Sequence, residues 1–149
     1  MLLKKYLFLL ITFLFIGASH TQDVATFKVV NYEINGENID HLAESDNIAV
    51  SFYACSEEIL CFTIESRNQK TQSYGKVIGL TKQVLEETDS TYKSYELKFN
   101  WKFVNSYDDK RGDAVVSFTK IYMGEIATFH AVIVVLSTNE KLTFKGYLE

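Results

Sequence analysis

The two cysteines of the chain, Cys55 and Cys61, have the spacing to form a covalent cross-link. They lie at the end of one candidate strand and the start of the next, and the alternation of apolar residues directs both side chains to one face. This arrangement predicts a structural disulfide, with two unpaired thiols or a redox or metal role as the alternatives. The spacing differs from the Cys-x-x-Cys redox motif, and no pair of histidines accompanies it as zinc ligands.

Histidines offer little catalytic chemistry in this chain. Asp40 precedes His41 and could orient its imidazole, but a catalytic triad also needs a nucleophile within reach. His130 alternates with Thr128 and Val132 in an apolar stretch, which is typical of a packed or surface histidine. The sequence has no nucleophile elbow, zinc-protease, P-loop or dinucleotide-binding motif. We therefore expect a protein that is not an enzyme and that has no catalytic residues, metal site or cofactor.

Residues 108–113 form a charged segment, Asp-Asp-Lys-Arg-Gly-Asp, between two candidate strands. We interpret it as a solvated turn in which Gly112 adopts the left-handed conformation. Two alternatives remain. The tripeptide Arg111-Gly112-Asp113 at a hairpin tip can bind integrins, and the aspartates could hold calcium weakly, although their spacing differs from an EF-hand loop.

A stripe of large apolar side chains dominates the middle of the chain. Alternate residues from Tyr95 to Phe103 are apolar, and the residues between them are polar, as expected for a strand with one buried face. With inward-pointing phenylalanines from other strands, these side chains either fill a core or line an apolar cavity. The candidate ligand-binding residues are Phe52, Phe62, Tyr95, Phe99, Trp101, Phe103 and Phe118.

The stretch from Ile126 to Leu136 is apolar on both of its alternating faces. One face can enter the core while the other meets a second surface. We predict that Phe129, Ile133 and Val135 face outward and form an interface for self-association or for a protein partner.

Period-two alternation with intervening turn residues recurs along the chain and predicts an all-β protein. Short connections join neighbouring strands, which favours a closed, eight-stranded antiparallel up-and-down barrel over the alternative, a two-sheet sandwich. Ile39, Leu42 and Ala43 have helical spacing and predict one short helix between the first two strands. The predicted strands are 24–34, 47–55, 60–67, 72–84, 92–105, 113–123, 125–137 and 141–148.

The chain begins with Lys4 and Lys5, a short apolar run and the small residues Gly17, Ala18 and Ser19, which is the pattern of a secretory signal peptide. We predict a signal peptide at 1–19 and one barrel domain at 20–149, in a secreted or periplasmic protein with no membrane span after cleavage. The chain of 149 residues has a formal net charge of −4, which disfavours nucleic acid as a partner.

The order of these features resembles the small lipocalin-like (calycin) proteins that bacteria export. The resemblance rests on the export signal, a first strand ending in Ile34-Asn35-Gly36, a short helical segment and a meander that ends in Leu142-Thr-Phe-Lys-Gly-Tyr-Leu148. It implies a non-enzymatic protein that holds a small apolar or amphipathic ligand inside the barrel. The alternative is a protein-interaction module, such as an inhibitor, an immunity-type protein or an envelope component, with a homo-oligomer or protein partner.

Overall fold

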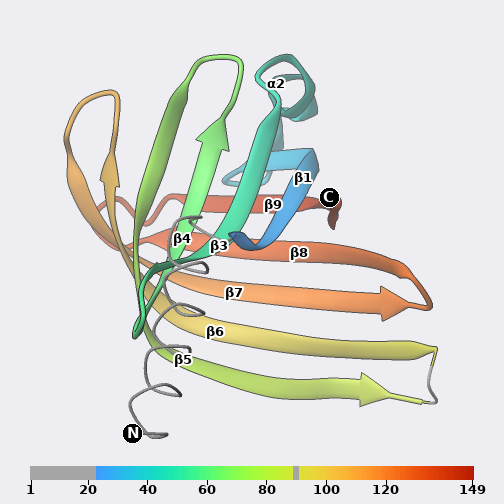
Figure 1. The fold of residues 1–149 in the computed structure, drawn as a ribbon. Coiled ribbons are helices and arrows are strands. Elements are labelled where there is room, and N and C mark those ends of the chain that lie inside the picture. The colour runs from blue at the N-terminus through green and yellow to red at the C-terminus, as the bar shows by residue number, and fades with distance from the viewer. Residues whose placement is uncertain (1–22, 89–90) are drawn as a thin grey trace, which may run out of the picture.

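The computed structural model of the chain describes residues 23–88 and 91–149, and Figure 1 shows its fold. The predicted signal peptide at 1–19 lies outside the described residues. Within these described residues, nine strands and one short helix follow in order: β1 (Asp23–Ile34), β2 (Glu37–Asn38), α2 (Asp40–Ser45), β3 (Ile48–Ser56), β4 (Ile59–Ser66), β5 (Thr71–Glu87), β6 (Tyr92–Asn105), β7 (Arg111–Met123), β8 (Ile126–Val135) and β9 (Lys141–Leu148).

All eight predicted strands are present, with bounds that differ from the prediction by a few residues at most, and the predicted helix is α2. The additional strand, β2, forms a two-residue hairpin with the end of β1. Asn35 and Gly36 connect them with φ angles of 52° and 84°, the left-handed pair that a tight hairpin turn requires. An Asn-Gly pair is a typical sequence signal for a tight hairpin turn, but the predicted strands did not include β2.

The sheet is closed, which confirms the barrel and rejects the two-sheet sandwich. Consecutive strands pair antiparallel from β3 to β9, and β1 pairs with both β3 and β9. Residues 23–28 of β1 pair with β3, whereas residues 27–34 pair with β9. The pairing of β1 with β9 has a register shift between Val29 and Asn31. Such an irregularity bends a strand, which allows β1 to pair with β3 along its first half and with β9 along its second half. Closure leaves no exposed edge around the middle of the barrel.

Strands β5 to β8 extend beyond the closed part of the barrel. The last residue of β5 that pairs with β4 is Lys76, but β5 continues alongside β6 as far as Glu87. Figure 1 shows β5, β6, β7 and β8 running together away from β3 and β4. We call this extension the flare and define it as residues 81–87, 92–98 and 119–123, which lie on the paired strands β5, β6 and β7.

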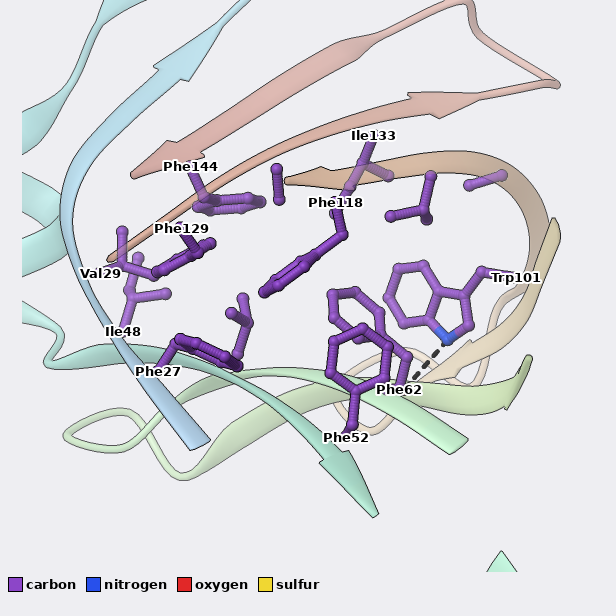
Figure 2. Packing of buried hydrophobic residues seen from close by; sticks show 14 of the residues in the cluster. Phe27, Val29, Ile48, Phe52, Phe62, Trp101, Phe118, Phe129, Ile133 and Phe144 are labelled. Atoms are coloured by element: carbon purple, nitrogen blue, oxygen red, sulfur yellow. Dashed lines mark hydrogen bonds between the residues drawn. The ribbon is translucent and has the colours of Figure 1, made fainter. Parts of the chain in front are cut away.

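Aromatic side chains fill the interior of the barrel (Figure 2). Phe118 contacts Phe27, Phe52 and Phe129, with ring centroids 5.1, 5.0 and 5.2 Å apart. Trp101 packs edge-on against Phe62 at 5.2 Å, and its indole N–H donates a hydrogen bond of 3.0 Å to the carbonyl oxygen of Phe62. Every large ring of this core therefore has apolar neighbours, and the one polar atom of Trp101 is satisfied.

The prediction that Phe129, Ile133 and Val135 form an outer interface was wrong. Phe129 is 3% exposed and Ile133 is fully buried, and both belong to the core, while Val135 is half-buried. Phe129 lies opposite Gly146 of β9, where the missing side chain leaves room for the ring. Because both faces of β8 are apolar, its alternation could not indicate which face turns inward.

Candidate functional site

The seven predicted ligand-binding residues divide into two groups in the structure. Five of them are buried within the core and fill it rather than line a cavity: Phe52, Phe62, Phe99, Trp101 and Phe118. The other two, Tyr95 and Phe103, are half-buried and lie toward opposite ends of β6. The interior position predicted for a ligand is therefore occupied by the protein's own side chains.

Phe103 lies at the end of the barrel away from the flare. Its ring covers Gly112, where any side chain would collide with it, and it packs at 4.7 Å on Trp101. Gly112 belongs to β7 and has no positive φ; the left-handed residue of this turn is Asp109, with φ of 56°. The predicted left-handed Gly112 was therefore wrong, and Arg111, Gly112 and Asp113 begin a strand instead of forming a hairpin tip.

A pocket of about 510 Å³ lies on the surface near Phe103, bordered by Lys76, Lys102 and Arg111. The ammonium of Lys102 forms an ion pair of 3.1 Å with Asp113, and both side chains are more than half exposed to solvent. Exposed ion pairs of this kind contribute little to binding energy because water screens them. We therefore regard this pocket as a solvated surface hollow.

The inner face of the flare brings together residues of more distinctive chemistry. Tyr95 of β6 lies opposite Val84 of β5 and Lys120 of β7, and the adjacent inward positions hold Lys82 and Tyr122. Alternation along β7 places Lys120 and Tyr122 on the same face as the buried Phe118. We call Lys82, Tyr95, Lys120 and Tyr122 the Lys–Tyr cluster.

Short contacts connect the members of the Lys–Tyr cluster. The ammonium of Lys82 lies 4.4 Å from the ring centroid of Tyr95, and that of Lys120 lies 4.7 Å from the ring of Tyr122. The two phenol oxygens are 3.5 Å apart. The ammonium of Lys120 also lies 5.2 Å from the ring of Phe27, which connects the cluster to the core beneath it. Cation–π attraction thus holds both lysines over aromatic rings.

The two ammonium groups of the cluster form no ion pair with the described residues. Among the residues whose side chains the structure describes, no carboxylate lies within 4 Å of the ammonium groups of Lys82 or Lys120. By contrast, Lys98 on the opposite face of β6 forms an ion pair of 3.3 Å with Glu96. Within the described residues, the inner face of the flare therefore presents two ammonium groups that lack a carboxylate partner and that could contact an external anion.

The pKa values of Tyr95 and Tyr122 are shifted in opposite directions by this environment. Burial raises the pKa of Tyr95, and the hydrogen bond to Tyr122 raises it further. Burial also raises the pKa of Tyr122, but hydrogen bonds from Lys120 and Tyr95 and the charges of Lys120 and Lys82 outweigh it, so the net pKa is lowered. Either phenol can donate the hydrogen bond that joins the two oxygens.

Sequence reasoning identified Tyr95 as a candidate residue but missed Lys82, Lys120 and Tyr122. A signal for two of them was present, because Phe118, Lys120 and Tyr122 alternate along one strand and a lysine on the apolar face of a strand is unusual. Lys82 had no comparable signal, since a bulge between Ile78 and Thr81 shifts the alternation of β5 ahead of it.

The predicted disulfide is present between Cys55 and Cys61. A register shift between Ala54 and Ser56 places Cys55 in a bulge of β3, diagonally across from Cys61 on β4. The bond joins the two strands of this hairpin close to its tip, where it stabilises their register.

Asp40 has a structural role at the start of α2. Its carboxylate accepts hydrogen bonds from the side chains of Asn31 and Asn38 and from the backbone N–H of Tyr32, at 3.0, 2.9 and 2.8 Å. The hydrogen bond from Asn38, followed by those from Tyr32 and Asn31, lowers the pKa of Asp40. The carboxylate thus joins β1, β2 and α2, and these bonds occupy both of its oxygens.

His130 lies half-buried on the outer face of β8, where burial and then the charge of Lys145 lower its pKa. Within residues 23–88 and 91–149, no group of three or more His, Cys, Asp or Glu side chains is placed to hold a metal ion. No helix in the same part of the chain is long and apolar enough to cross a membrane.

Comparisons of the chain with models of protein families, with curated proteins and with solved structures found no match.

Proposed function

We propose that this chain is an exported, non-enzymatic binding protein that holds a small amphipathic molecule at the inner face of the flare. The observation that carries the proposal is the pair of ammonium groups at Lys82 and Lys120, which lie over aromatic rings and have no carboxylate partner among the described residues. An anionic head group is the natural complement of two such charges. The ligand position thus moves from the filled interior to the open end of the barrel.

The surroundings of the cluster suit the apolar part of the same ligand. Leu97 and Phe118 lie opposite one another directly beneath the cluster, and Val84 lies opposite Tyr95. Val84 is 48% exposed, so burying it under an alkyl chain or ring would remove apolar surface from water. Tyrosine supplies an apolar ring and a polar hydroxyl, which is the mixture that an amphipathic ligand requires.

Export and a lipocalin-like relationship are part of this proposal. The disulfide is consistent with an oxidising compartment, where such bonds persist, and the predicted signal peptide would direct the chain there. The closed eight-stranded barrel with a short helix after its first strand is the layout expected of lipocalin-like proteins. Because the core fills the interior, we place the ligand at the end of the barrel instead of within it.

Calorimetric titration with decanoate and with uncharged 1-decanol tests the proposal, because the two probes share a chain length and differ in charge. We expect decanoate to bind at least tenfold more tightly, since charge-assisted hydrogen bonds contribute about 1.5–3 kcal/mol. The double variant Lys82→Gln/Lys120→Gln should remove this preference.

The matched control for the titration is Lys98→Gln, which removes one positive charge from the outer face of the same region. This variant should bind decanoate as the parent protein does. Equal affinity for the two probes, or an equal loss of decanoate affinity in the control, would contradict the proposed site.

A further inference from the structure

Two of the three lysines that we place on the inner face of the flare lack an ion pair among the described residues. Lys93 of β6 lies opposite Tyr122 and therefore shares this face with the Lys–Tyr cluster. Its ammonium forms an ion pair of 3.6 Å with Glu87, which balances its charge. Lys82 and Lys120 have no such partner in the described part of the chain. A ligand that neutralises both of them therefore carries two negative charges.

Both unpaired ammonium groups act on the phenol oxygen of Tyr122. The ammonium of Lys120 lies 4.7 Å from the ring centroid of Tyr122. That of Lys82 lies 4.4 Å from the ring centroid of Tyr95, and the two phenol oxygens are 3.5 Å apart. Burial raises the pKa of Tyr122, but its hydrogen bonds with Lys120 and Tyr95 and the charges of both lysines lower it. The two charges therefore converge on one place and form a single site.

The cluster has more hydrogen-bond donors than a carboxylate can use. Each ammonium group has three N–H donors, and each phenol adds a hydroxyl. A carboxylate carries one negative charge on two oxygens, whereas a phosphate monoester carries close to two charges on three terminal oxygens at neutral pH. The phosphate monoester therefore matches the cluster better, both in charge and in the number of acceptors.

We propose that the head group held at the Lys–Tyr cluster is a phosphate monoester, bound as a dianion by the ammonium groups of Lys82 and Lys120. This inference rests on the proposed function and narrows its anionic head group to one chemical class. The phenol hydroxyls of Tyr95 and Tyr122 complete the set of donors. The ester oxygen carries the apolar part of the ligand, which packs on the exposed Val84 opposite Tyr95.

Calorimetric titration with decyl phosphate and decyl sulfate tests the charge of the head group. Both probes have the same alkyl chain and three terminal oxygens, but the phosphate gains its second charge at about pH 6, whereas the sulfate keeps one charge. We expect decyl phosphate to bind about tenfold more tightly than decyl sulfate at about pH 7.5, and the two probes to bind equally at about pH 5, where the phosphate also carries one charge.

Decyl sulfate also serves as the control for the protein's own groups. Titration of the cluster, or of Lys93 and Glu87 beside it, would change the affinity for both probes and leave their ratio as it was. Equal affinities at about pH 7.5 would overturn the proposal. A preference for decyl phosphate that stays tenfold at about pH 5 would also overturn it, because that preference would not depend on the second charge.

Single substitutions test whether both lysines contribute to the preference. Lys82→Gln and Lys120→Gln should each lower the preference for decyl phosphate over decyl sulfate about threefold, because a dianion loses twice as much Coulomb energy as a monoanion. The control Lys98→Gln removes a charge from the outer face and should leave the preference unchanged. If neither cluster variant changes the preference, or if the control changes it equally, the phosphate does not bind at this cluster.

Inorganic phosphate distinguishes a phosphate ester from free phosphate as the ligand. In competition with decyl phosphate at about pH 7.5, it should bind at least about tenfold more weakly, because it has no apolar chain to bury against Val84. Equal affinities would assign the cluster to free phosphate and overturn the ester. The comparison of decanoate with 1-decanol remains a separate test. If decanoate binds more tightly than 1-decanol but decyl phosphate binds no more tightly than decyl sulfate, the phosphate inference fails and the proposed function stands.

Discussion

The middle of the barrel and the flare share strands β5, β6 and β7, but their inner faces differ in polarity. Phe118 of β7 is fully buried, whereas Lys120 and Tyr122, further along the same face, are half-buried and polar. In the middle, a complete ring of strands surrounds each inward side chain. In the flare, the opposite wall is missing because β4 pairs with β5 no further than Lys76. Position relative to that wall therefore decides whether an inward residue supports the fold or remains available to a ligand.

The largest expected effect is the loss of a ring from the middle of the barrel. Phe118→Ala should lower the free energy of unfolding by about 3–5 kcal/mol, because the cavity left among the surrounding phenylalanines cannot fully collapse. In the flare, Tyr122→Ala should lower it by about 1 kcal/mol, since the ring is only partly buried. Denaturant-induced unfolding measures both values. Equal losses would mean that the two regions do not differ as described.

An intermediate loss of stability is expected when the Cys55–Cys61 disulfide is removed. The double variant Cys55→Ser/Cys61→Ser should lose about 2 kcal/mol of stability, the loop-closure estimate for a short loop. Thermal or denaturant unfolding of the oxidised protein, the reduced protein and the variant provides the measurement. The reduced parent and the variant should match. If reduction leaves the stability unchanged, the bond does not stabilise the hairpin.

A smaller effect is expected at the Lys–Tyr cluster, where removing the charge of one lysine should change the pKa of a neighbouring tyrosine. Lys120→Gln should raise the pKa of Tyr122, because burial already acts in that direction and the variant removes the opposing ammonium. Tyrosinate absorbance during an alkaline titration reports this shift. Lys98→Gln, on the outer face, should leave the titration unchanged. A downward shift would place Lys120 away from Tyr122 in solution.

The smallest expected effect concerns Asp40, at the junction of β1, β2 and α2. The pKa of its carboxyl is lower in the folded chain than in the unfolded chain, so its contribution to stability is present above about pH 4 and is lost as the pH falls through the folded value. The stability difference between the parent protein and Asp40→Asn should therefore shrink on acidification below pH 4. Unfolding curves over a series of pH values test this. If the stability difference grows on acidification, the folded chain does not lower the pKa of Asp40.

Local sequence patterns were reliable wherever a strand has one apolar face. The stretch from Tyr95 to Phe103 predicted both the limits and the inward face of β6 because its polar and apolar residues alternate without interruption. The same reasoning failed at β8, where both faces are apolar and the alternation cannot indicate that Phe129 turns inward, opposite Gly146 of β9. At the Lys–Tyr cluster, sequence reasoning found one residue of four, since the cluster depends on diagonal neighbours from three strands.

The sequence by itself determined the strands, the short helix and the cysteine pair, because alternation, turn residues and short connections are local properties of the chain. Only the tertiary structure decided how β1 divides its pairing between β3 and β9, that aromatic rings fill the interior and that β5 extends past β4. These features depend on the relative lengths and registers of strands that are distant in sequence. No local pattern encodes them, because packing within a closed barrel sets the register of every strand at once.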